Sequence, residues 1–161
     1  MRIKWAAIVI LGWACLANIK AAETDLNRID YKQWYREPFN DQSSFGDVET
    51  VYLVENVRPE YKPKPDKDIV YRKEDLVALT GSIFTNPKGN FEVVIVIYDT
   101  DRTTPLLAVY AEDRNQLESL PLVVYYWVGG KWKKVPADFN SEEPDLFWYL
   151  YEQTGKLVYY P

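Results

Sequence analysis

Histidine is absent from this sequence of 161 residues. Its absence excludes Ser-His and Cys-His nucleophile pairs, histidine general bases, and every zinc or iron site that needs an imidazole ligand. The seven glycines are scattered, and neither GxGxxG nor GxxxxGK(S/T) occurs, so the sequence predicts no glycine-rich phosphate-binding loop. These absences favour a protein that is not an enzyme and binds no cofactor. The chemistry that they leave open is that of carboxylates, lysine, tyrosine, hydroxyl groups and oxygen-ligated metal ions.

Cysteine is nearly absent too, because Cys15 is the only one, and it lies in a segment that we expect to be removed. Two basic residues within the first four positions precede an uncharged apolar run, Trp5 to Ala17. A basic start and an apolar run of about 13 residues are typical of a secretory signal peptide, whereas a membrane-spanning helix needs about 20 apolar residues. We therefore predict a signal peptide over residues 1–21 and an exported protein, periplasmic or secreted. Lipid attachment at Cys15 is the alternative, and the bulky Trp13 argues against it.

The chain that would remain, residues 22–161, has no cysteine, so no disulfide can stabilise it. About 140 residues are enough to bury one core, and we predict a single β-rich domain without a transmembrane segment. Removal of Arg2, Lys4 and Lys20 would change the formal net charge from −5 to −8. A protein that binds nucleic acid is expected to be basic, so nucleic acid is not a predicted partner.

Aromatic and β-branched residues are abundant and gather in short runs, as strands require. Gly129-Gly130 predicts a two-residue hairpin turn, and Gly81 inside its run predicts a bulge or bend. Because the runs follow one another every 12–16 residues or so, they favour an antiparallel meander over alternating strands and helices. The strands are predicted over residues 48–57, 69–72, 76–85, 91–98, 106–112, 122–128, 131–135 and 156–160.

One helix is predicted near the carboxyl end. Acids and a proline at 141–145 suit a helix start, and Gly155 suits a left-handed residue that ends the helix. The stretch between them is apolar almost all round, so this helix is buried on more than one side or contacts a partner through Phe147, Trp148 and Tyr151. The fold class is then α+β and β-dominated: an antiparallel meander, or a small OB-like barrel, of five to six strands covered by the helix.

Two segments read as irregular. Residues 22–47 are polar and aromatic without a clear period, and we expect them to be poorly ordered apart from a short helix that Pro38 would end. Residues 58–68 contain three prolines and three lysines, which predicts an extended surface loop.

Asp99 and Asp101 follow the most apolar strand and are the candidate metal ligands. Two carboxylates one residue apart could share Ca²⁺, Mg²⁺ or Mn²⁺, which would support a carboxylate-based or metal-dependent hydrolase. The sequence "DTDRTTPLL" lacks the further oxygen ligands of a calcium loop, and aspartate commonly makes turns by bonding its own backbone. The turn is therefore the favoured interpretation of this pair.

Tyr125, Trp127 and Trp132 flank the Gly-Gly turn and are the candidate ligand-binding residues. If exposed, their rings would stack on a sugar, as in a carbohydrate-binding module; otherwise they pack in the core. The sequence as a whole favours an exported, non-catalytic binding or assembly protein of the cell envelope that acts through protein–protein contacts. The predicted partner is a protein in the envelope or extracellular space, with a glycan as the alternative.

Overall fold

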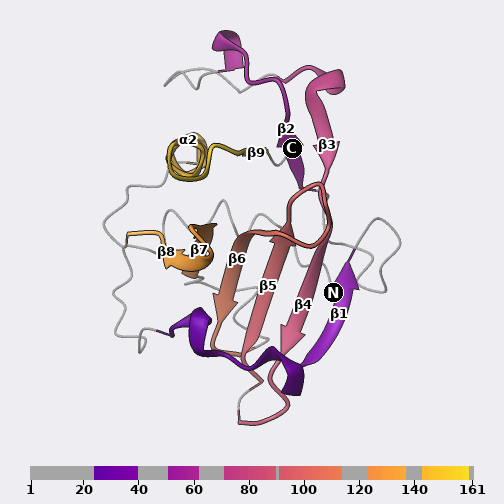
Figure 1. The fold of residues 1–161 in the computed structure, drawn as a ribbon, viewed down its shortest axis with the longest axis vertical. Coiled ribbons are helices and arrows are strands. Elements are labelled where there is room, and N and C mark those ends of the chain that lie inside the picture. The colour runs from indigo at the N-terminus through magenta and orange to yellow at the C-terminus, as the bar shows by residue number, and fades with distance from the viewer. Residues whose placement is uncertain are drawn as a thin grey trace.

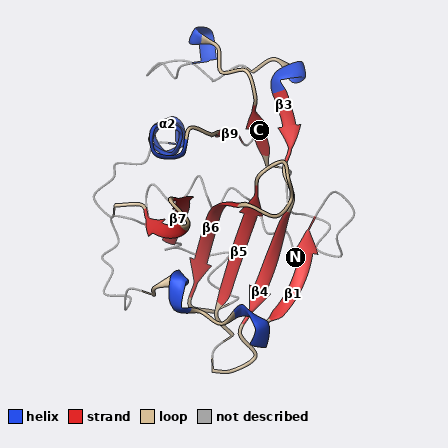
Figure 2. Ribbon diagram, viewed as in Figure 1, coloured by secondary structure: helices blue, strands red, loops and turns tan. Residues whose placement is uncertain are grey.

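The computed structural model describes residues 24–39, 51–61, 71–89, 91–113, 123–136 and 143–159. They form two antiparallel sheets and the helix α2 (Glu143–Thr154), as Figures 1 and 2 show. The larger sheet has the order β1 (Tyr35–Phe39), β4 (Gly81–Thr85), β5 (Val93–Tyr98), β6 (Pro105–Ala111), β7 (Val123–Val128) and β8 (Lys131–Lys134). The smaller sheet has the order β3 (Leu76–Ala78), β2 (Tyr52–Val54) and β9 (Leu157–Tyr159).

The predicted β-dominated meander is confirmed, because β4 to β8 pair in chain order. The OB-like barrel is wrong, since β1 and β8 lie at opposite ends of the larger sheet and do not pair within the described residues. Both end strands carry features that oppose further pairing. Pro38 in β1 has no N–H to donate, and Lys131 and Lys133 in β8 are exposed.

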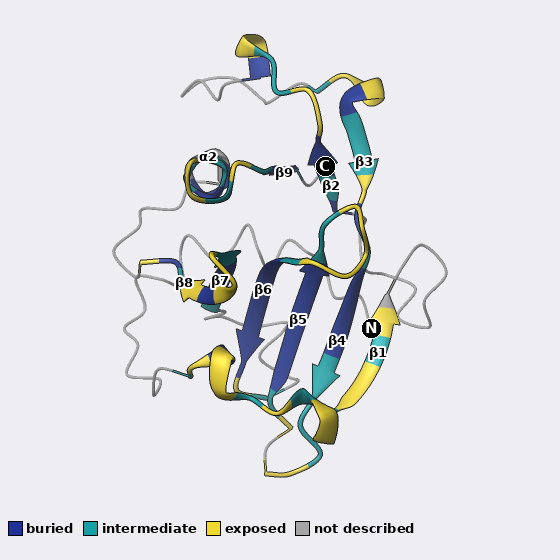
Figure 3. Ribbon diagram, in the orientation of Figure 1, coloured by how far each residue is buried: buried dark blue, intermediate teal, exposed yellow. Residues whose placement is uncertain are grey.

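Strand β5 is buried on both faces, as its unbroken apolar run predicts. Val93, Ile95 and Ile97 share one face and belong to a core that includes residues of α2, β2 and β9. Val94 and Val96 share the other face. Figure 3 shows how β4, β5 and β6 form the buried centre of the larger sheet, beside the mostly exposed β1.

The amino-terminal segment covers part of the second face. Leu26 is 1% exposed and packs in the same cluster as Val94 and Val96. Asn27 fixes this segment to β8, because its side chain accepts from the N–H of Trp132 at 2.8 Å and donates to the Trp132 carbonyl at 3.0 Å. Hydrogen bonds between residues 105 positions apart therefore hold the cover in place.

The structure differs from the expectation for residues 22–47 where it describes them. Two 3₁₀ turns, η1 (Leu26–Arg28) and η2 (Tyr31–Gln33), replace the predicted helix, and β1 follows them. Asp25 and Asp30 cap the two turns by accepting from the backbone N–H two residues ahead. The proline expected to end a helix lies instead in the end strand β1, a position that tolerates it.

The predicted strand over residues 76–85 is wrong as a single strand. It divides into β3 of the smaller sheet and β4 of the larger one. At the division, Leu79 donates its N–H to Val51 at 2.8 Å, while the Thr80 carbonyl accepts from Tyr98 at 2.9 Å. Successive residues thus bond to different sheets. The bend predicted at Gly81 is where the chain changes sheets.

Two other strand predictions are too long or misplaced. Of residues 48–57, only Tyr52–Val54 form a strand among those described. Tyr71 and Arg72 lie outside any strand, just before the 3₁₀ turn η4 (Lys73–Asp75), while residues 69 and 70 lie outside the described residues. Of the loop predicted at 58–68, the described residues end at Tyr61 in the 3₁₀ turn η3 (Pro59–Tyr61).

Both predicted glycine turns are confirmed. Gly129 and Gly130 have φ of +61° and +78° and join β7 to β8, as a type I′ hairpin turn requires. Gly155 has φ of +72° and donates its N–H to the Tyr151 carbonyl at 2.8 Å, which ends α2 with a single left-handed cap. No helix in the described ranges is long and apolar enough to span a membrane.

Candidate functional site

The loop after β5 is held by Asp101, whose carboxylate accepts hydrogen bonds from residues of the same loop. Asp101 Oδ1 accepts from the N–H groups of Thr103 and Thr104 at 2.8 and 2.7 Å, and Oδ2 accepts from the Thr104 hydroxyl. The hydroxyl bond and then the two backbone bonds lower the pKa of Asp101 to about 2. Arg102, which lies between Asp101 and Thr103, has φ of +62°. This geometry is that of an aspartate-stabilised turn.

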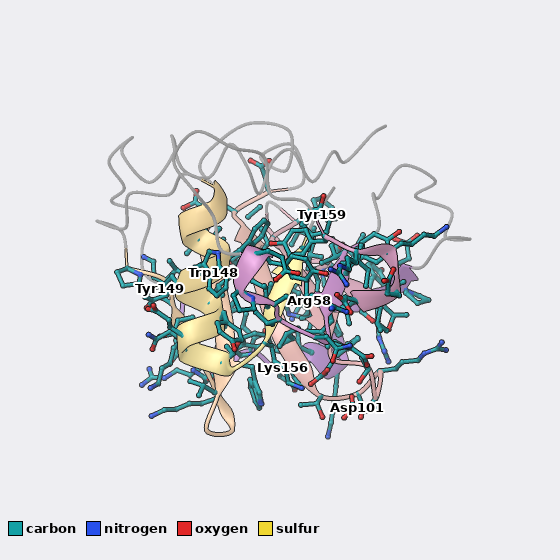
Figure 4. All side chains as sticks on the ribbon, turned by 90° about the horizontal axis from the view of Figure 1, so that it is seen from above. Arg58, Asp101, Trp148, Tyr149, Lys156 and Tyr159 are labelled. Atoms are coloured by element: carbon teal, nitrogen blue, oxygen red, sulfur yellow. The ribbon has the colours of Figure 1, made fainter. Side chains whose placement is uncertain are left out.

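Asp99 is bound elsewhere. Its Oδ2 lies 3.2 Å from Lys156 Nζ, and its Oδ1 accepts from the Thr100 N–H at 2.7 Å. Lys156 and Asp101 lie on the same side of the molecule in Figure 4. The predicted metal pair therefore forms one turn and one ion pair, which joins the β5–β6 loop to the start of β9. The described residues contain no group of three or more acidic side chains placed to hold a metal ion.

The aromatic residues around the hairpin form a packed layer. Trp127 and Trp132 lie opposite each other in the register, with ring centres 5.1 Å apart and planes at 73°. Tyr125 is 4% and Trp132 is 8% exposed, and the Tyr125 hydroxyl donates to the Thr24 carbonyl at 2.6 Å. Tyr125 and Trp132 thus pack as core residues beneath the amino-terminal segment, and Trp127 is half-buried, so the three rings form no exposed platform.

The apolar helix is buried on two sides. Leu146 and Leu150 pack into the main core, while Phe147 packs into a second cluster with Val54, Tyr61 and Leu157. Trp148 and Tyr151 are half-buried against that second cluster, with ring centres 5.3 Å apart. Contacts within the chain thus account for much of this apolar surface, which the sequence left open to burial on more than one side or to a partner.

Asp75 is the buried charged side chain among the residues that the structure describes, and sequence reasoning missed it. It ends η4 and is 1% exposed. Arg58 binds its carboxylate in a two-pronged contact, Nε to Oδ2 at 2.6 Å and Nη2 to Oδ1 at 3.1 Å. The Tyr61 hydroxyl also donates to Oδ2, and Asn56 Nδ2 donates to Oδ1 at 3.2 Å. All four donors come from residues 56–61, so the cluster fastens this segment to η4.

The electrostatics of this cluster suit a structural role. The hydrogen bonds from Arg58, then those from Tyr61 and Asn56, hold the pKa of Asp75 well below its ordinary value of 3.8. Burial, and then the bond to Asp75, raises the pKa of Tyr61, so that its hydroxyl stays protonated near neutral pH. Neither group is then suited to exchange protons near neutral pH, which general acid–base catalysis requires. The four donors also leave no site on the carboxylate for a substrate.

The exposed aromatic rings lie at one end of the larger sheet. At this end β1 begins, and a turn joins β4 to β5. Tyr35 is 68% exposed and Phe91 is 51% exposed, and they are the exposed large hydrophobic residues among those described. Tyr35 pairs with Thr85, the last residue of β4, and Phe91 lies two residues before β5. Both therefore lie at one end of the sheet, the lower end in Figure 1. We call Tyr35 and Phe91 the aromatic end.

Phe91 is held in an unfavourable backbone conformation. Its φ is +60°, in the left-handed region that a side chain of this size rarely adopts. The turn around it is well bonded: the Asn86 N–H donates to the Glu92 carbonyl at 2.8 Å, and Asn86 Nδ2 donates to Glu92 Oε2 at 2.9 Å. The Tyr110 hydroxyl donates to Glu92 Oε1 at 2.7 Å. The turn thus holds Phe91 in a strained backbone conformation with its side chain about half exposed.

Sequence reasoning did not identify the aromatic end. Tyr35 lies in a segment that looked irregular, and Phe91 looked like the first residue of a strand. A partial signal was present, because Phe91 directly follows the turn sequence "NPKGN", where a chain can leave the strand conformation. Its exposure and φ depend on how the turn closes, which the sequence pattern does not specify.

No family model, curated protein or solved structure matches the chain.

Proposed function

We propose that this chain is an exported, non-catalytic binding or assembly protein of the cell envelope, and that it contacts a protein partner through the aromatic end. The observation that carries the proposal is Phe91. Phe91 is unfavourable in the free protein for two reasons: its ring exposes apolar surface, and its backbone is strained. Asn or Gly would fit this backbone better, so the fold alone does not explain a phenylalanine there.

The edges of the larger sheet are poor alternatives for the contact. Pro38 in β1 lacks an N–H, and β8 carries exposed lysines, so neither favours the addition of a partner strand. The end of the larger sheet where β1 begins carries two exposed aromatic rings instead. Exposed Tyr and Phe side chains are the kind of residue that carries much of the binding energy at protein interfaces.

Export is the part of the proposal supported by sequence, and it has its own test. We expect the protein recovered from its native cells to begin near residue 22 and to lie outside the cytoplasm. Mass spectrometry of the intact protein from separated cell fractions measures both. A chain that retains Met1 and stays in the cytosol would refute export.

The contact is tested by photo-cross-linking in cells that make the protein. A benzophenone amino acid replaces Tyr35 or Phe91 in the full chain, and the exposed Gln153 of α2 and Lys133 of β8 are the matched control positions. We expect the first two positions to give an adduct with one protein and the controls to give none. The proposal fails if positions 35 and 91 give no adduct, or the same set of adducts as the controls.

A further inference from the structure

The side chain of Asn27 takes the place of a neighbouring strand on the outer edge of β8. The Val135 N–H donates to the Val124 carbonyl at 2.9 Å, so these two residues form a hydrogen-bonded pair of the β7–β8 hairpin. Such pairs alternate along antiparallel strands, and the backbone groups of Trp132 and Lys134 therefore face away from β7. Asn27 binds both groups of Trp132: Oδ1 accepts from the N–H at 2.8 Å, and Nδ2 donates to the carbonyl at 3.0 Å. A residue of an adjacent antiparallel strand would offer the same acceptor and donor.

The segment that carries Asn27 reaches both edges of the meander formed by β4 to β8. We call residues 24–39 the amino-terminal arm. Its first residues are anchored beside β8, because Leu26 is 1% exposed in the cluster of the second face and the Tyr125 hydroxyl donates to the Thr24 carbonyl at 2.6 Å. The arm then crosses to β1, which pairs with β4 at the opposite edge (Figure 1). One segment thus occupies the two outer edges of these five strands.

The backbone groups that Asn27 binds would fit β8 of a second copy of the chain. If two β8 strands met antiparallel around Trp132, the N–H of each Trp132 would bond to the carbonyl of the other, which replaces both bonds from Asn27. This register would place the exposed Lys131 of one copy opposite the exposed Lys133 of the other. Like charges directly opposite each other weaken a strand pair but leave its backbone bonds available. The lysines alone therefore do not close this edge.

We propose that Asn27 makes an autoinhibitory contact: while the amino-terminal arm is docked, its amide keeps β8 from pairing with β8 of a second copy. Release of the arm exposes the backbone groups of Trp132 and allows that pairing. A second copy is the occupant because the two-fold pairing around Trp132 satisfies the same donor and acceptor on both chains at once. The proposal concerns a different surface from the aromatic end, and it does not depend on the proposed function.

The first test compares the full chain with the release variant Leu26→Ser/Asn27→Ala, which removes the buried anchor of the arm and both bonds to Trp132. Sedimentation velocity measures the dissociation constant of self-association, and circular dichroism establishes that the variant is folded. We expect the release variant to form dimers at least about tenfold more tightly than the wild type. Added salt should strengthen this association, because it screens the repulsion between the facing lysines.

Two additional substitutions in the release variant test the strand pairing itself. Lys131→Glu would place a glutamate opposite Lys133 of the second copy, twice by symmetry, so dimers should be about threefold to tenfold tighter and should weaken with added salt. Lys134→Pro removes an N–H that faces away from β7, so it should return association to the wild-type level without breaking the hairpin. Lys131→Glu in a chain with the arm intact is the matched control, and it should associate no more than the wild type.

The outcomes decide between pairing at β8 and adhesion of an uncovered apolar face. Association of the release variant that ignores both Lys131→Glu and Lys134→Pro would overturn the proposal, and so would a folded release variant that associates no more than the wild type. If the release variant does not fold, Asn27→Ala/Lys131→Glu replaces it, because this variant keeps the Leu26 anchor. Its self-association must then exceed that of Lys131→Glu alone, and equal values would overturn the proposal.

Discussion

Replacing Phe91 with asparagine should leave the stability of the fold nearly unchanged. Two opposing terms can be worked out from the structure. Asparagine tolerates the left-handed φ of +60°, which relieves about 1 kcal/mol of backbone strain. Phe91 is 51% exposed, so the substitution gives up about half of the burial of a phenylalanine, or about 1 kcal/mol. The free energy of unfolding should therefore change by less than about 0.5 kcal/mol.

Urea denaturation followed by tryptophan fluorescence measures this difference. For a domain of this size, the midpoint should move by less than about 0.3 M. Phe91→Ala is the companion variant, because alanine keeps the strain and loses the burial, so it should cost about 1 kcal/mol. Phe147→Ala is the contrasting variant in α2, where the ring is 3% exposed, and it should cost about 3–5 kcal/mol.

A loss of more than about 1.5 kcal/mol in Phe91→Asn would refute the reasoning, since it would mean that Phe91 packs as a core residue. The strain would then be a by-product of packing, and the aromatic end would lose the observation that supports it. Equal stabilities for the Asn and Ala variants would refute the strain term alone, because only asparagine relieves it.

Three further outcomes follow from the packing and the ionisation of the fold. Leu150→Ala should lower the free energy of unfolding by about 3–4 kcal/mol, because the side chain is 1% exposed and borders an apolar cavity of about 20 Å³ that cannot compensate for its loss. Urea denaturation measures this change, and Gln153→Ala on the exposed side of α2 is the control. Equal urea midpoints for the two variants would contradict the prediction. Asp75→Asn should destabilise the protein at pH 7, and the difference in melting temperature from wild type should shrink as the pH falls below 3.8. The reason is that a carboxyl group whose pKa is lowered in the folded state adds stability above its unfolded pKa and loses that contribution in acid. A difference in melting temperature that stays constant from pH 7 to 2.5 would count against the buried ion pair. Burial is the main cause that raises the pKa of Tyr110 and Tyr149 to about 12. The contribution of these two groups to stability is therefore complete below pH 10 and is lost as the pH rises toward 12. Absorbance at 295 nm should show that part of the tyrosine ionises only well above pH 10, and full ionisation at pH 10 in a folded chain would contradict this.

Local patterns predicted the meander well. The runs at 91–98 and 122–128 are apolar on both faces, and both form strands of the larger sheet, β5 and β7. Gly129-Gly130 and Gly155 were predicted correctly as turn and cap, because few residues other than glycine adopt their positive φ. In each case the signal lies within a few neighbouring residues.

Contacts between distant segments were not predictable in the same way. Residues 76–85 read as one strand, yet Leu79 and Thr80 bond to different sheets. No local pattern singled out Asp75, and only the approach of Arg58 and Tyr61 makes it part of a buried ion pair. The sequence left Trp132 open to an exposed platform as well as to the core, and the placement of Leu26 and Asn27 over that face decided between them.

The sequence by itself determined which side-chain chemistry the protein offers and that its strands form an antiparallel meander, because residue types and local periodicity are properties of neighbours along the chain. The tertiary structure decided which aromatic rings are buried and, in the part of the chain that the structure describes, that Tyr35 and Phe91 are exposed. Exposure depends on what packs above a side chain, and the segments that pack together here are as much as 105 residues apart. Tyr35 and Phe91 could therefore be distinguished from the other aromatic residues only once the chain was folded.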